Sequence, residues 1–162
     1  MTEKTCTNVY EFLWRICLKA VLSDVPVVVG MDAELDESSV DDVTHTEDKI
    51  VSQWKEVSAD EQHQLREQFD EILRPFGFET SLVVIRRANS LALIFICMTL
   101  SALMRLRDQF TSGQLKDILE SLFTFLSVAT RTVCVKRFSW SLTDYEQSLK
   151  FFGFVQGNLT NQ

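Results

Sequence analysis

The sequence predicts an all-α fold, and two observations carry that prediction. Glycine and proline are scarce, with 5 Gly and 2 Pro in 162 residues, whereas β-sandwiches and β-barrels need many tight turns. Apolar residues also recur at spacings of three and four in several segments, which is the period of an amphipathic helix. The run Leu91–Met104 carries no charge. We expect it to form a buried helix at the centre of one domain, residues 1–162.

Composition and charge exclude several functional classes. The net charge of −7 disfavours binding to nucleic acid or to an anionic membrane surface, because both need a basic face. Four cysteines without a C-x-x-C spacing and only two histidines predict no metal site and no cofactor. The first residues lack the apolar core of a signal peptide, so we expect a cytoplasmic protein.

The first half of the chain is expected to hold three amphipathic helices and one loop. The apolar stripe predicts a helix over Val9–Leu22. The acidic segment of about residues 31–48 has no clear period and is expected to be a flexible loop. A short helix over Lys49–Glu56 follows. Ser58–Glu61 matches a capping box, which predicts a helix that runs on to Leu73 and ends before Pro75 and Gly77.

The second half is expected to hold the central helices. The uncharged run has about 17 residues if it is counted from Ala88, near the lower limit for a membrane span, so a buried helix and a membrane-inserting one stay open. Helical spacing predicts a second long helix over Ser112–Arg131 and a short aromatic helix over Thr143–Phe152. Gly153 would end this helix, and residues 154–162 would form a polar tail.

The motifs that mark common enzyme classes are missing from the sequence. There is no phosphate-binding glycine loop, no nucleophile elbow and no H-E-x-x-H zinc motif. Two histidines supply little equipment for acid–base catalysis. We therefore expect a binding module rather than an enzyme.

Three segments carry a resemblance to a known family. Val9–Leu18 is similar to the fourth homology motif of the B-cell-lymphoma-two family of apoptosis regulators. Gln64–Leu73 resembles the stretch after that family's third motif. Phe138–Tyr145, followed by Lys150–Gly153, resembles the second motif. The expected helix order is also similar, and the resemblance implies a bundle of about seven or eight helices around a hydrophobic hairpin.

The resemblance also implies a function. Members of the family that promote survival bind an amphipathic helix of a pro-death partner in a hydrophobic groove. Arg87 would pair with an aspartate of that helix and Arg86 is the second choice; the alternative is that both arginines are only exposed charges beside a buried helix. The groove residues that the resemblance implies are Trp54, Leu65, Phe69, Ile72, Leu73, Phe76, Val84, Arg86, Arg87, Leu91 and Phe95.

The resemblance leaves a survival factor and a pro-death member open, and the missing signature of the third motif favours a survival factor. A chain that ends without a membrane anchor suits a cytosolic, truncated or virally encoded relative. Such a relative would be cytoplasmic and could associate with mitochondria. Two other functions stay open. The chain could be a self-associating scaffold domain whose apolar groove forms a homodimer interface. It could also be a membrane-active protein whose hairpin, residues 88–104 and 115–135, inserts into a bilayer.

Overall fold

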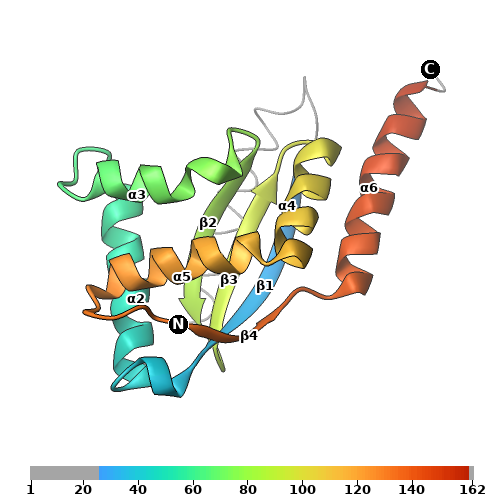
Figure 1. Ribbon diagram of the computed structural model, residues 1–162. Helices are drawn as coiled ribbons and strands as arrows, with labels where there is room; N and C mark the ends of the chain where they lie inside the picture. The colour runs from blue at the N-terminus through green and yellow to red at the C-terminus, as the bar shows by residue number, and fades with distance from the viewer. Residues whose placement is uncertain (1–25, 161–162) are drawn as a thin grey trace.

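The computed structural model describes residues 26–160 of the chain, so the helix predicted over Val9–Leu22 lies outside the described residues. This part of the chain contains both strands and helices (Figure 1). The strands are β1 (Val27–Leu35), β2 (Thr80–Arg87), β3 (Leu91–Cys97) and β4 (Val135–Ser139). The helices are α2 (Val43–Ala59), α3 (Arg66–Leu73), α4 (Leu100–Ser112), α5 (Gln114–Ser127) and α6 (Leu142–Thr160), with short 3-10 turns at Glu37–Ser39 and Arg74–Phe76.

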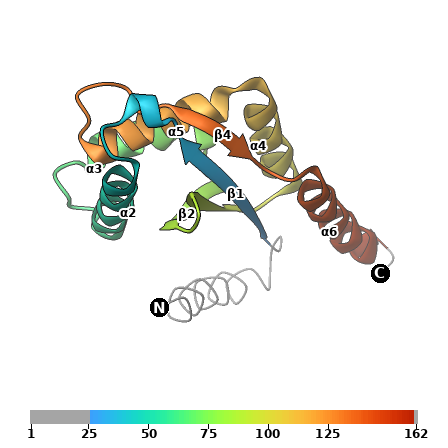
Figure 2. The ribbon, with the colours of Figure 1, turned by 90° about the horizontal axis from the view of Figure 1, so that it is seen from below.

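The four strands form one antiparallel sheet in the order β2-β3-β1-β4. The chain therefore has the split β-α-β-β-α-β arrangement, in which the first and third strands lie at the centre. Figure 2 shows α4 and α5 on one side of this sheet. The predicted all-α bundle of seven or eight helices is wrong, and so is the central helical hairpin that it required.

The uncharged run Leu91–Met104 is not the single buried helix that the sequence predicts. Residues Leu91–Cys97 form β3, and the helix α4 begins only at Leu100. Strand β3 lies between β2 and β1, and six of its seven residues are buried. A strand that is buried on both faces reads as a continuous apolar run, which periodicity cannot distinguish from a buried helix. Thr99 then caps α4, because its Oγ1 accepts a hydrogen bond of 3.1 Å from the amide of Ala102.

The acidic segment is also ordered, which corrects the predicted loop at residues 31–48. Its first part belongs to β1, whose residues alternate between the buried and exposed faces, and only the carboxylates of Asp32 and Glu34 interrupt the apolar pattern. Asp36 and Asp42 then begin the 3-10 turn and α2 as N-caps. Four of the carboxylates in this segment are thus polar positions of a half-exposed strand or caps of helical segments.

The remaining helix predictions are partly confirmed. The predicted helix at Lys49–Glu56 lies within the longer α2, and the one at Ser112–Arg131 corresponds to α5. The capping box at Ser58 does not start a helix, because α2 continues to Ala59 and α3 begins at Arg66. Gly153 does not end the last helix either, since α6 runs on to Thr160 through most of the predicted polar tail.

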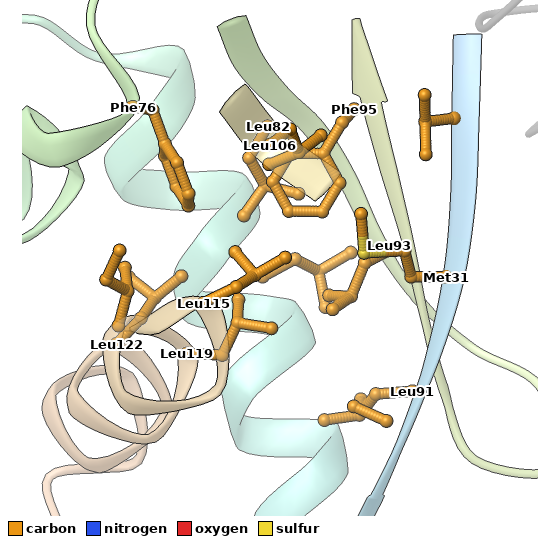
Figure 3. Close-up of a cluster of buried hydrophobic side chains, with 14 of the residues drawn as sticks. Met31, Phe76, Leu82, Leu91, Leu93, Phe95, Leu106, Leu115, Leu119 and Leu122 are labelled. Atoms are coloured by element: carbon orange, nitrogen blue, oxygen red, sulfur yellow. The ribbon is translucent and has the colours of Figure 1, made fainter. Parts of the chain in front are cut away.

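The hydrophobic core lies between one face of the sheet and the helices. Figure 3 shows Met31, Leu93 and Phe95 of the sheet facing Leu115 and Leu119 of α5. The alternate residues of β1 that belong to this core are at most 5% exposed. Each fully buried leucine of this kind stabilises the fold by about 1.5–3 kcal/mol relative to an exposed one.

Strand β4 is positioned by helix α5. The backbone amide of Val135 donates to Glu120 Oε2 at 2.7 Å, and that of Val133 donates to Thr124 Oγ1 at 2.9 Å. The amide of Cys134, which lies between them, donates to Ser39 Oγ of the first 3-10 turn at 3.0 Å. Side chains thus accept hydrogen bonds from the amides at the start of this short edge strand.

Helix α6 is attached to α4 through one arginine. The guanidinium of Arg107 lies 5.0 Å from the ring centroids of Phe110, Trp140 and Tyr145. It also donates a 3.0 Å hydrogen bond to the carbonyl of Trp140. A cation among three aromatic faces is a favourable arrangement, and it fixes the point at which the chain leaves β4 and enters α6.

Candidate partner-binding site

A cleft of about 260 Å³ lies between α2, α3 and β2. We call it the α2–α3 cleft. Four residues of the predicted groove line it, Trp54, Phe69, Leu73 and Phe76, and the first residues of β2 close it on the other side. It takes shape because α2 and α3 are joined by a short turn and both precede the strand β2.

Aromatic rings build the wall of the cleft. The rings of Trp54 and Phe69 lie 5.3 Å apart between centroids, at an interplanar angle of 45°. Phe76 packs edge-on against Phe95 of β3, at 5.5 Å and 80°. Aromatic pairs with this geometry contribute about 0.5–1.5 kcal/mol beyond the burial of their area. These rings are at most 4% exposed, so they form a rigid wall that belongs to the core.

Arg66 is the cation of the cleft. Its Nε donates to Asp70 Oδ1 at 3.0 Å, and its guanidinium carbon lies 5.2 Å from the ring centroid of Phe69. One terminal nitrogen donates to the carbonyls of Val57 and Ser58, at 3.1 and 3.2 Å. These carbonyls end α2, so Arg66 also caps that helix. The side chain is 25% exposed and that of Asp70 is 60% exposed, so the charged pair stands at the rim.

The other apolar residues of the predicted groove lie elsewhere. Leu65 and Ile72 are partly buried on α3 and pack against the core outside the cleft. Val84 is partly buried on β2, beyond the bulge between Leu82 and Val84. Leu91 and Phe95 are fully buried in β3. These five residues therefore serve the core or a different part of the surface.

The two arginines of the prediction also lie away from the cleft. Arg87 is exposed and pairs with Asp48 of α2, with 2.9 Å between NH1 and Oδ1. Arg86 is partly buried, and its Nε atom is buried without a hydrogen-bond partner. The cleft contacts β2 at Thr80–Leu82. Arg87 lies five positions after Leu82 along the strand, which corresponds to about 17 Å.

Seven residues that line the cleft are absent from the predicted groove, and Arg66 and Ser81 are two of them. Arg66 could have been found from its i,i+4 spacing to Asp70 on a predicted helix, which is the spacing of a surface ion pair. Ser81 is exposed and lines the cleft from β2. It could not have been found, because Thr80–Arg87 was not recognised as a strand.

No metal site and no membrane helix is found within residues 26–160. This part of the chain has no group of three or more His, Cys, Asp or Glu side chains that could hold a metal ion. None of its helices has both the length and the apolar character to cross a bilayer. Comparisons with protein-family models, with curated proteins and with solved structures give no match.

Proposed function

We propose that this protein is a protein-interaction module that binds an amphipathic helix of a partner at the α2–α3 cleft. One observation carries the proposal: four of the residues expected to form a partner groove line this one cleft. Helix recognition of this kind places apolar residues of the ligand in pockets of the receptor. The pro-death helix that the family resemblance implies is the first partner class to test.

The size of the cleft determines how such a helix would bind. Pockets for small molecules have volumes of about 300–1,000 Å³, so about 260 Å³ takes one large apolar side chain. The helix would insert a single anchor beside Trp54 and Phe69 and lay its neighbouring turns over Leu73. Binding through one buried anchor surrounded by weaker contacts is common at protein interfaces.

Arg66 supplies the polar part of the recognition. It takes the place that the resemblance gave to Arg87, because it is the arginine at the cleft. A carboxylate of the ligand would approach the guanidinium and compete with Asp70, which is the more exposed member of the pair. Arginine is suited to this exchange, since its planar group binds carboxylates with two parallel hydrogen bonds.

Titration calorimetry with helical peptides tests the proposal. The panel contains the death-motif helices of several pro-death proteins and, for each, a variant whose anchor residue is replaced by alanine. Ser81→Trp fills the cleft from an exposed position and should lower the affinity at least tenfold. Ser139→Trp, at an exposed position of β4 outside the cleft, is the matched control and should leave affinity unchanged.

Two results would contradict the proposal. If no peptide binds at 200 µM, or if both tryptophan variants weaken binding to the same extent, the α2–α3 cleft is not the binding site.

A further inference from the structure

A second groove lies on the opposite edge of the sheet, between the first half of β1 and helix α6. Its volume is about 370 Å³. Val27–Gly30 of β1 form one wall, and the other includes Asp144, Gln147, Ser148 and Phe151 of α6. We call it the β1–α6 groove. In Figure 1 α6 stands at the side of the sheet that carries β4, away from α3.

Among residues 26–160, the groove exposes a strand edge that no other strand pairs with. Strand β4 pairs with β1 only over Asp32–Leu35, and beyond Ser139 the chain turns at Trp140 into α6. Within the described part of the chain, Val27–Met31 pair with β3 alone. Every second residue of an antiparallel strand directs its N–H and C=O toward the same side. The free backbone groups of this half of β1 therefore face the position that β4 would occupy if it continued.

The walls of the groove define the chemistry of an occupant. Val28 and Phe151 are both 39% exposed, although they are large and apolar. Asp144 supplies a carboxylate, and no Lys or Arg lines the groove. Two apolar contacts with one carboxylate fit a segment that has apolar residues and a basic one.

We propose that the β1–α6 groove binds an extended segment of a partner protein, added to the sheet as a strand beside β1, with a Lys or Arg opposite Asp144. An extended segment satisfies the free N–H and C=O groups of β1, whereas a helix has no backbone groups left to pair with them. Strand addition next to a helix is a known mode of peptide recognition. A second copy of this chain is disfavoured as occupant, because each copy has a net charge of −7.

This groove is independent of the α2–α3 cleft. The cleft adjoins β2 and the groove adjoins β1 and α6, at the other end of the strand order β2-β3-β1-β4. Failure of helical peptides to bind at the cleft would thus leave the prediction for the groove intact.

The first experiment selects and then modifies a peptide. A phage-displayed library of nine-residue peptides is selected on the full-length protein, and the best sequence is made as a synthetic peptide. Each of its amide nitrogens is then methylated in turn. Strand addition predicts that methylation at alternate positions weakens binding at least tenfold, since only every second amide of the peptide donates to β1. Replacing its basic residue with norleucine should also weaken binding.

The second experiment places the peptide on the protein. Asp144→Lys should lower the affinity at least tenfold, while Glu146→Lys makes the same change at an exposed position of α6 outside the groove and should have little effect. Saturating peptide should also slow hydrogen exchange at alternate amides of Val27–Met31. Circular dichroism of both variants verifies that they are folded.

Three results would overturn the proposal. One is that the selection yields no peptide that binds below 100 µM. Another is that methylation has the same effect at every position of the peptide, or that both lysine variants weaken binding equally. The third is that the amides of Val27–Met31 are all protected in the full-length protein without peptide, because the strand edge would then already be occupied.

Discussion

Val128 occupies a conformation that a valine rarely adopts, and replacing it with glycine should stabilise the protein. It ends α5 with φ 53° and ψ 41°, in the left-handed region. Its amide and that of Ala129 bond to carbonyls of the last turn of α5, which is how a left-handed residue closes a helix. Glycine has no Cβ and adopts this conformation without steric cost.

The expected gain is small, because three effects oppose one another. A side chain in the left-handed region costs about 1–2 kcal/mol, and a β-branched one lies at the upper end. Val128 is 62% exposed, so losing its side chain removes only about 0.5 kcal/mol of burial. The greater freedom of glycine in the unfolded chain costs about 0.4–1 kcal/mol. Together these effects predict that Val128→Gly raises the free energy of unfolding by about 0.5 kcal/mol. The test depends on the sign of this change.

Urea unfolding, followed by circular dichroism at 222 nm, measures this difference. The control is Val28→Gly, which makes the same chemical change at a partly exposed position of β1. There the backbone is extended, no strain is relieved, and we expect a loss of about 1–2 kcal/mol. If Val128→Gly lowers stability as much as Val28→Gly does, the end of α5 is not strained. The slope m should be the same for all three proteins.

Two further predictions concern buried side chains, and a third concerns the contact between α4 and α6. Burial raises the pKa of Glu47 above its ordinary value of 4.5. The folded state therefore holds this proton more tightly and loses stability as the pH rises through the folded pKa. The Tm gain of Glu47→Gln over the wild type should be largest at neutral pH and vanish at about pH 4. Burial raises the pKa of Cys97 to about 11, so at neutral pH peptide mapping after iodoacetamide should find it unmodified while the partly exposed Cys134 reacts. Arg107→Lys keeps the charge but loses the planar group that lies over three rings. Limited trypsin digestion should therefore cleave α6 faster than in the wild type. An unchanged rate of cleavage would show that Arg107 does not hold α6 against α4.

Most helices could be predicted from the sequence because each has one apolar face and one polar face. Ile50, Trp54 and Val57 repeat along α2 at helical spacing, and Leu115 and Leu119 do so along α5. These patterns arise within a single element and need no knowledge of its neighbours. The ends of the helices were less certain, because a cap such as Thr99 looks like any other threonine until the strand that precedes it is known.

The sheet could not be predicted in the same way. Only β1 alternates cleanly between buried and exposed residues, and its carboxylates made it look like a loop. Strand β3 has no polar face, because it lies at the centre of the sheet under the helices. Its β-branched residues Ile94 and Ile96 and the turn Ala88–Ser90 before it were the available signals. The scarcity of glycine argues against a β fold more strongly than these signals argue for one. This sheet needs few glycines because most of its strands are joined by long connections rather than by tight turns.

The predicted groove is partly present in the structure, because its helical part could be predicted from the sequence and its strand part could not. Trp54, Phe69, Leu73 and Phe76 line one cleft because α2, α3 and the 3-10 turn after α3 follow one another in the chain. The sequence predicts a helix in both places, so this part of the groove could be predicted. The family resemblance puts Arg87 at the rim because it implies an arginine at the start of a central helix, here Leu91–Met104. Because Leu91–Cys97 is a strand, Arg87 lies in a β-hairpin about 17 Å along β2 from the cleft. The positions of the two arginines can be compared directly. Arg66→Gln, at the cleft, should weaken binding of an acidic helical peptide, whereas Arg87→Gln, away from the cleft, should not.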